Sequence, residues 1–306
     1  MQTTIKTPIS FVGVGLHTGM PVRVTVHPAS AEYGIWFRRT DIEDVDALIP
    51  ACWDYVEQSP LCTKIVNEAG VSVTTIEHLM AALAGCGIRN ALIEVNGPEV
   101  PILDGSAAPF VRKFLARGVQ QLSAPTRAIE VLKRIEVRDG PALARLEPAD
   151  GLEIAFTIDF EDAAIGRQTK TLNMANGAFV RELCDSRTFC RQSDVDTMRA
   201  NGLALGGTYD NAVVVDGADI LSPGGLRHSD EAVRHKMLDA LGDLALAGPP
   251  LLARYTGKRA GHRLTNELLR ALFSDPTAYR LVTCDRGRAR QLPGVGVDRH
   301  DLPLTA

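Results

Sequence analysis

The sequence predicts an α+β protein built from two related halves, and three observations support this. Both parts of the chain contain short stretches with alternating apolar residues, such as 22–26 and 152–158, which are typical of half-buried strands. Helix-like stretches follow in each part, at about 75–84 and 230–247. These two helices share a pattern in which a histidine, His78 or His235, precedes a methionine by two residues and a glycine by seven. This short internal repeat predicts two related halves that face one another.

The boundary between the halves is expected at 123–126, because Pro125 and its small polar neighbours break both periodicities. A chain of 306 residues is long enough for two domains. We therefore expect an N-terminal domain over 1–124 and a C-terminal domain over 125–292. The tail at 293–306 has no periodicity and is expected to be loosely held.

The elements of the N-terminal half follow from local patterns. Strands are expected at 22–26, 34–37 and 91–95. In the helix expected at 75–84, apolar residues recur at helical spacing and two glycines follow its end. A second helix is expected at 107–116, after an Asp-Gly turn.

The C-terminal half restarts the strand pattern at 152–158 and has a continuous apolar run at 213–215. Its most strongly marked helix covers about 230–247, with Ser229 as the expected N-cap and Gly-Pro-Pro at its end. A further helix-like run begins at 261 and ends near 273.

The composition excludes several classes of protein. A net charge of -4 and a pI near 6.0 argue against a nucleic-acid-binding protein. No apolar stretch is long enough to span a membrane, and residues 1–10 do not resemble a secretory signal, so we expect a cytoplasmic protein. The six cysteines form no C-x-x-C pair, which makes a disulfide framework or a thiolate zinc site unexpected.

A metal site is suggested by the 230–247 helix, where His235, Asp239 and Asp243 follow one another at intervals of four residues and share one face. Zinc accepts imidazole nitrogen and carboxylate oxygen, so a histidine and an aspartate one turn apart could hold one ion with a third ligand from elsewhere. The same spacing is also common on the solvated face of an amphipathic helix. The local pattern alone leaves both explanations open.

Two other histidines stand in positions suited to chemistry. In Glu77-His78 the histidine could bind a metal while the glutamate reaches its bound water. The alternative is that Glu77 belongs to a capping box with Thr74. His262 follows a glycine at the start of a predicted helix, where it could exchange protons or simply be a surface residue.

Several longer motifs remove these ambiguities. They are VGVGLHTG at 12–19, TTIEHL at 74–79, VNGPEVPILDGSAAPF at 95–110, SRTF at 186–189, VRHKMLDALGDL at 233–244, and Gly261-His262. Together they closely resemble the UDP-3-O-acyl-N-acetylglucosamine deacetylase family, the zinc enzymes of the first committed step in lipid A synthesis. The similarity runs in the family's order from about residue 3 to 290.

The resemblance implies a fold and a set of roles. The fold is two α/β-sandwich halves whose helices pack face to face between two sheets, with the active site between the halves. Matched by motif, the zinc ligands are His78, His235 and Asp239. Glu77 matches the general base, and His262 matches the general acid. Asp243 matches the carboxylate that orients His262, and Thr188 matches the hydroxyl near the oxyanion. The residues matching substrate contacts are Cys62, Phe189 and Lys236.

The implied substrate is a UDP-linked acylated amino sugar, UDP-3-O-[(3R)-3-hydroxyacyl]-N-acetylglucosamine, whose N-acetyl group is released as acetate. Zn²⁺ is the expected cofactor, although Fe²⁺ also suits a His₂Asp site. The acyl chain is expected to lie in an apolar passage formed by parts of 189–215. Cys190, Arg191 and Gln192 depart from the family there, where glycine and an apolar residue are usual.

Two rival functions follow from these observations. The departures at Arg191 and Gln192 suggest an amidase of the same fold that acts on an N-acetyl substrate without the lipid. A protein of another class, a binding protein with structural zinc, would need a fourth protein ligand, for which His228 is the nearest spare candidate.

Overall fold

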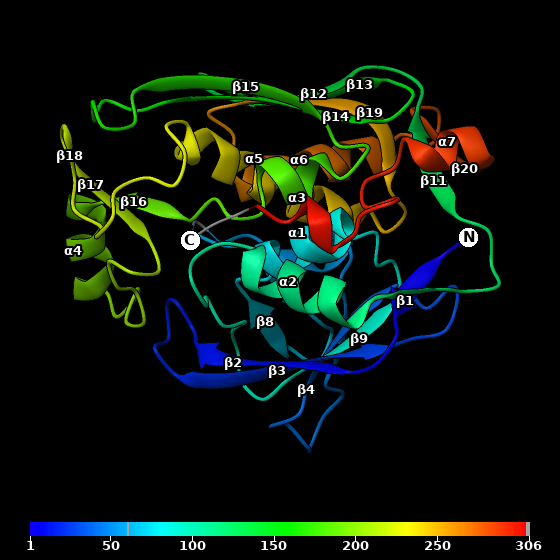
Figure 1. Ribbon diagram of the computed structural model, residues 1–306, viewed down its shortest axis with the longest axis horizontal. Coiled ribbons are helices and arrows are strands. Elements are labelled where there is room, and N and C mark those ends of the chain that lie inside the picture. The colour runs from blue at the N-terminus through cyan, green and yellow to red at the C-terminus, as the bar shows by residue number, and fades with distance from the viewer. Residues whose placement is uncertain (60, 304–306) are drawn as a thin grey trace.

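Two β-sheets enclose a layer of helices in the computed structural model, which describes residues 1–59 and 61–303 (Figure 1). In Figure 1 the sheet formed early in the chain lies at the bottom, the sheet formed later lies at the top, and α1, α5, α2 and α3 lie between them. Each sheet hides one face against the helices, as a sheet with one apolar face must. The predicted α+β fold, with helices packed between two sheets, is confirmed.

The lower sheet has the strand order β2-β3-β9-β4-β5. Its strands are β2 (Ile9–Val14), β3 (Pro21–Pro28), β9 (Ala91–Val95), β4 (Ile35–Arg39) and β5 (Leu48–Pro50). The alternation expected in β3 is present, because Val22, Val24 and Val26 are all buried. Within this sheet, β4 and β9 run parallel to one another.

The upper sheet has the order β12-β13-β19-β11-β20, and β14 and β15 extend it through β19. Its strands are β11 (Arg127–Val131), β12 (Ile135–Asp139), β13 (Ala142–Pro148), β14 (Leu152–Asp159), β15 (Arg167–Asn173), β19 (Leu251–Lys258) and β20 (Tyr279–Thr283). The predicted strand at 152–158 is β14, and its four apolar side chains alternate into the core.

The helical layer brings the two conspicuous helices of the sequence into contact. Its helices are α1 (Glu77–Gly85), α2 (Ala108–Arg117), α3 (Ala178–Glu182), α5 (Glu231–Leu244) and α6 (His262–Phe273). α1 and α5 pack directly on one another. The glycine that follows each histidine by seven residues lets its helix approach a neighbouring segment closely. A Cβ on Gly242 would lie 2.1 Å from the carbonyl oxygen of Glu77, and one on Gly85 would lie 1.9 Å from the Phe179 ring.

Smaller elements complete the molecule. They are β1 (Thr3–Ile5) with β10 (Val119–Gln121), β6 (Val56–Glu57) with β7 (Lys64–Val66) and β8 (Ser72–Thr74), and β16 (Phe189–Arg191) with β17 (Val213–Asp216) and β18 (Asp219–Ile220). The helices outside the central layer are α4 (Gln192–Ala200) and α7 (Arg286–Arg290), and the 3-10 turns are Trp53–Tyr55, Ala245–Ala247 and Arg299–Asp301. α4 and β16–β18 form a lobe at one end of the helical layer (Figure 1).

Two details differ from the expected helix starts. Ser229 is not the N-cap of α5, since the helix begins after Asp230, which makes no side-chain cap hydrogen bond. Thr74 and Glu77 form no capping box, because α1 begins at Glu77 itself with Ile76 at the N-cap position. Asp230 instead pairs with Arg234 of the same helix and with Lys170 of β15, and Glu77 accepts a hydrogen bond from Thr63.

The segment after Leu292 touches the rest of the molecule at several points. Asp301 accepts a hydrogen bond of 2.6 Å from Arg181 of α3, and Val297 and Leu302 lie against the core. These contacts hold part of the tail that was expected to be loose, while 304–306 lie outside the described residues. The boundary expected at 123–126 lies in the segment 122–126 that connects β10 to β11.

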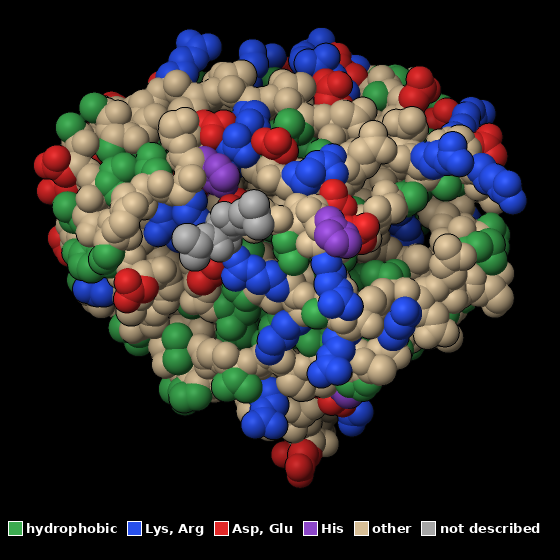
Figure 2. All heavy atoms as spheres, in the orientation of Figure 1, with side chains coloured by type: hydrophobic (Ala, Val, Ile, Leu, Met, Phe, Trp, Pro, Cys, Tyr) green, Lys and Arg blue, Asp and Glu red, His purple; other side chains and the backbone are tan. Residues whose placement is uncertain are grey.

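Charged side chains of both signs are spread over the face shown in Figure 2. Within the described chain, no helix combines the length and the apolar character needed to cross a bilayer.

Candidate active site

Three of the predicted site residues converge where α1 and α5 touch. His78 is the second residue of α1, and His235 and Asp239 lie one turn apart on α5. The Nε2 atoms of His78 and His235 lie 3.6 Å and 3.3 Å from Asp239 Oδ1. All three side chains are buried, and their ligand atoms lie within 4.8 Å of one another. Ligands of one tetrahedral ion bound at about 2.0 Å are separated by about 3.3 Å, so the spacing fits a metal.

The chemistry of these donors also fits a cation. Asp239 Oδ1 is buried and has no hydrogen-bond partner among residues 1–59 and 61–303. Burial alone would raise the pKa of Asp239, but His235 and Lys236 hold it well below its ordinary value. An ionised, unpartnered and buried carboxylate oxygen is costly unless a cation meets it.

His235 is oriented from behind by the backbone. Its Nδ1 lies 3.0 Å from the carbonyl oxygen of Ser186, so the ring donates there and leaves Nε2 free as a lone-pair donor toward Asp239. Burial lowers the pKa of His235 to about 4, which keeps the ring neutral. A neutral imidazole of this tautomer is the form that ligates metals.

Glu77 lies beside the triad and is held by another segment. Its Oε2 accepts a hydrogen bond of 3.0 Å from the backbone N–H of Thr63, rather than capping α1. Burial raises the pKa of Glu77, against the opposing effects of His262 and His78. A carboxyl whose pKa is raised is suited to take up a proton near neutral pH.

His262, the first residue of α6, is paired with Asp243 of α5. Its Nδ1 lies 2.8 Å from Asp243 Oδ2, and the Thr63 hydroxyl donates to Asp243 Oδ1 at 2.5 Å. Burial alone would lower the pKa of His262, but the charge and hydrogen bond of Asp243 raise it to about 9. The ring is therefore protonated at pH 7 and available as an acid.

The site opens into a cavity of about 630 Å³. The cavity is lined by Thr188, Phe189 and Lys236. Glu77, His262 and the three possible metal ligands also line it. Lys236 donates to Asp239 Oδ2 at 2.7 Å, and the Phe189 ring meets the His235 ring edge to face at 6.3 Å. The part of the cavity beside α4, which we call the apolar arm, is lined by Val195, Met198, Ala204, Ala212 and Val214. Asp194, Thr197 and Arg199 of α4 are also among the lining residues.

Two predicted residues lie differently from the rest. Cys62 is buried near Glu77 but is not among the side chains that line the cavity; burial and Glu77 raise its pKa to about 11. His228 is bonded to Asp185, with 2.9 Å between Nε2 and Oδ1, and does not join the three metal-type ligands. The structure therefore offers no support for His228 as a fourth ligand.

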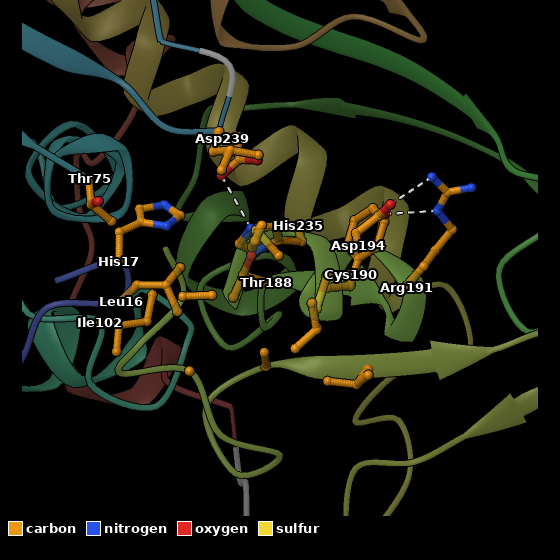
Figure 3. Close-up of a pocket in the computed structure, with 18 of the residues that line it drawn as sticks. Leu16, His17, Thr75, Ile102, Thr188, Cys190, Arg191, Asp194, His235 and Asp239 are labelled. Atoms are coloured by element: carbon orange, nitrogen blue, oxygen red, sulfur yellow. Dashed lines mark hydrogen bonds and ion pairs between the residues drawn. The ribbon is translucent and has the colours of Figure 1, made fainter. Parts of the chain in front are cut away.

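Residues to which sequence reasoning gave no role also shape the site. They are Thr63, which holds both Glu77 and Asp243, and the Ser186 carbonyl behind His235. His17 lines the cavity as well (Figure 3). His17 lies within one of the resembling motifs, so motif membership could have suggested it, whereas no local pattern marks Thr63.

These features define a class of protein. Two histidines and one aspartate able to hold an ion, a carboxyl with a raised pKa beside them, and a charged histidine in one cavity are the arrangement of a metal-dependent hydrolase.

Comparison with known proteins identifies the family. A sequence model of the UDP-3-O-acyl N-acetylglycosamine deacetylase family matches residues 2–274. A UDP-3-O-acyl-N-acetylglucosamine deacetylase of Phenylobacterium zucineum is 51% identical over 282 residues, covering 92% of this chain and 96% of the relative. A protein of the same name from Idiomarina loihiensis is 46% identical and covers 94% of this chain and 94% of its own length. One from Anaeromyxobacter sp. is also 46% identical and covers 92% of this chain and 91% of its own length. The chain belongs to the UDP-3-O-acyl N-acetylglycosamine deacetylase family.

Proposed function

We propose that this chain hydrolyses the N-acetyl group of UDP-3-O-[(3R)-3-hydroxyacyl]-N-acetylglucosamine with Zn²⁺ held by His78, His235 and Asp239. The observation that carries the proposal is the convergence of two Nε2 atoms on a buried oxygen of Asp239 that has no hydrogen-bond partner among the described residues. Two imidazoles and one carboxylate are typical of catalytic zinc sites, which keep one position for water or substrate. Fe²⁺ suits the same donors and is the alternative metal.

When bound, the ion acts as a Lewis acid toward the acetamide carbonyl and lowers the pKa of water at the site. Glu77 takes a proton from the attacking water, since its carboxyl has a raised pKa and lies beside the triad. The Thr63 N–H fixes one of its oxygens and leaves the other to face the reacting group. Attack at the carbonyl carbon places negative charge on the carbonyl oxygen.

Thr188 is suited to stabilise that oxyanion with its hydroxyl. Its backbone is fixed on both sides, because its N–H donates to Gly105 and its carbonyl accepts from Val213. A donor held before the reaction begins needs no reorganisation when charge develops, and such a donor is worth about 3–4 kcal/mol.

His262 delivers the proton that the leaving amine needs as the C–N bond breaks. Asp243 keeps the ring charged and fixes which nitrogen faces the reaction, since Nδ1 is engaged and Nε2 lies on the side of Asp239, 4.0 Å from its Oδ2. The products are acetate and the 2-amino sugar.

The remaining roles follow from position in the cavity. The apolar arm toward α4 suits the acyl chain, and Phe189 and Lys236 suit substrate contacts. Cys62 would act only indirectly, through Glu77. We further propose that 1–124 supplies Glu77 and His78 and 125–292 supplies the other site residues, and that the reaction takes place in the cytoplasm.

One experiment tests the proposal directly. The purified protein is analysed for bound metal and assayed for acetate release from the acylated UDP-sugar and from unacylated UDP-N-acetylglucosamine. We expect about one zinc per chain and a strong preference for the acylated substrate. Equal rates on both sugars would contradict the lipid substrate and favour the non-lipid amidase.

Replacement of a ligand is the matched test of the metal site. Asp239→Ala is expected to lose metal and activity together. Glu94→Ala, which removes a carboxylate paired with His27 on the lower sheet, serves as the control and should keep both. Full metal content in Asp239→Ala would contradict the ligand assignment.

A further inference from the structure

His17 is a half-buried residue that lines the active-site cavity, and its ring has no hydrogen-bond partner among the described residues. Both of its ring nitrogens are buried, and neither forms a hydrogen bond with any described part of the chain. Leaving buried polar atoms unpaired costs free energy, so such groups in native proteins usually meet a water or a ligand. The mechanism above does not use this residue.

The backbone that carries His17 is held firmly. The carboxylate of Glu99, itself 1% exposed, accepts hydrogen bonds from four groups. These groups are His17 N at 2.9 Å, Thr18 N at 2.9 Å, Thr18 Oγ1 at 2.8 Å and Thr75 Oγ1 at 2.9 Å. Thr75 lies two residues before Glu77, so Glu99 ties the His17 loop to the start of α1. The imidazole is therefore held in place although its nitrogens are unpaired.

The same loop also meets the opposite side of the cavity. Leu205 N donates to the His17 carbonyl at 3.2 Å, and Gly206 N donates to the Leu16 carbonyl at 3.0 Å. A Cβ on Gly206 would lie 2.1 Å from the carbonyl oxygen of Gly15, so only glycine permits this approach. His17 thus lies where the N-terminal loop closes against the segment that follows α4.

Figure 3 shows the His17 ring pointing into the cavity, with Leu16 and Ile102 beside it and Thr188 and His235 across from it. Leu16 and Ile102 are apolar, whereas Thr188 and His235 belong to the reacting centre. His17 therefore stands at the junction between the metal-type site and the apolar arm. In the proposed substrate, the group at that junction is the ester that joins the acyl chain to the sugar.

We propose that His17 donates a hydrogen bond to the carbonyl oxygen of the 3-O-acyl ester, and so positions the acylated sugar with its acetamide at the reacting centre. The proposal rests on the proposed function. The neutral ring has one N–H donor and one acceptor nitrogen. An ester carbonyl needs only the donor, and the other nitrogen can accept from a hydroxyl on the acyl chain.

The charge state of the ring agrees with this role. Burial lowers the pKa of His17 below its ordinary value, against the opposing charge of Glu99. A neutral donor binds an uncharged ester without adding a third cation to the cavity that His262 and Lys236 already line.

The test compares two substrates in two variants. One substrate is the acylated UDP-sugar, and the other is its 3-O-alkyl ether, in which CH₂ replaces the ester carbonyl. His17→Phe keeps a planar ring and removes both nitrogens, while His17→Gln keeps an N–H donor. His27→Phe is the matched control, because His27 lies on β3, pairs with Glu94 and does not line the cavity.

For the ester we expect His17→Phe to raise KM and lower kcat/KM about tenfold with little change in kcat, since the bond holds a part of the substrate that does not react. We expect His17→Gln to recover part of this loss. For the ether, wild type and both variants should have similar kcat/KM. Metal content and thermal unfolding of His17→Phe should match those of the control.

Equal losses on ester and ether in His17→Phe would overturn the proposal, because they would mean a structural role. If that variant does not fold, the wild type still decides, because equal kcat/KM for ester and ether would overturn the proposal. A preference of about tenfold for the ester that His17→Gln keeps in part would support a hydrogen bond from the side chain. Failure of wild type to release acetate from either substrate would refute the proposed function instead.

Discussion

At the scale of single residues, the same side-chain types acquire different properties from their surroundings. His235 and His262 differ most clearly. The pKa of His235 falls to about 4 because burial dominates, while Asp243 raises the pKa of His262 to about 9 against burial. One histidine is therefore a neutral ligand and the other a charged acid, although both lie within the same cavity.

The role of Glu77 gives the prediction that belongs to this scale. Glu77→Gln keeps an acceptor for the Thr63 N–H but cannot take up a proton at neutral pH. We expect acetate release to fall by roughly 10²–10⁴-fold, the usual contribution of a general base, with metal content unchanged. Steady-state acetate assays combined with metal analysis check this. Activity close to that of wild type would mean that another group is the base.

At the scale of elements, the site depends on how closely two helices approach. α1 supplies Glu77 and His78, and α5 supplies His235 and Asp239. Gly242 lets them meet, because any side chain there would collide with the backbone of Glu77. The glycine seven residues after each histidine therefore marks a position where its helix packs closely against another segment of the chain.

Replacement of this glycine should damage stability and activity together. In Gly242→Ala the added Cβ forces α1 and α5 apart, which we expect to cost about 1–3 kcal/mol of unfolding free energy. Activity should fall as well, since the ligands come from both helices. Urea unfolding and acetate release measure the two effects. Gly97→Ala is the control, because its Cβ would meet only Val22 at 3.5 Å; an equal effect there would contradict this explanation.

The lobe of β16, β17 and α4 carries a second prediction at this scale. Cys190, at the centre of β16, projects into the cavity beside the apolar arm (Figure 3). Cys190→Gly removes that side chain and should favour longer acyl chains. Each additional buried methylene is worth about 0.8 kcal/mol, or about fourfold in kcat/KM.

The measurement is a series of substrates that differ only in acyl length. Cys284→Ala, which changes a cysteine outside the cavity, should leave the preference as in wild type. The same optimum length in Cys190→Gly and wild type would show that Cys190 does not limit the passage.

At the scale of the whole molecule, buried ion pairs make stability depend on pH. Glu231 at the start of α5 pairs with Arg187, with 2.9 Å between Nε and Oε1, and both side chains are buried. Burial alone would raise the pKa of Glu231, but hydrogen bonds from Arg187 and from the Arg227 N–H lower it. This pair fastens the site-bearing helix to the segment that carries Thr188.

The sign of the effect follows from that lowered pKa. A carboxyl whose pKa is lower in the folded state contributes stability above its unfolded pKa of about 4.3, and the contribution is lost as pH falls through the folded pKa. Glu231→Gln should therefore lower the unfolding free energy by about 3 kcal/mol at pH 7. Urea unfolding at several pH values should show this difference shrinking below about pH 4. A difference independent of pH would contradict the role of the ion pair.

The sequence by itself determined the element types and the chemical inventory. Alternation in β3 and β14 and the apolar spacing of α1 are local signals, because the side-chain period of a strand or helix is set by backbone geometry. The motifs around His78, His235 and His262 identified the family, since they are long and specific. Spacing on α5 alone could not distinguish a metal site from a solvated helix face.

Only the tertiary structure decided what each of these groups meets. Glu77 could have capped its own helix, but it accepts a hydrogen bond from the N–H of Thr63. One oxygen of Asp239 has no hydrogen-bond partner in the described part of the chain, and two histidines point to it. His17 gained its place through Glu99, which is 82 residues further along the chain. The physical reason is that burial, pKa and hydrogen-bond partners depend on segments distant in sequence, and local periodicity carries no information about them.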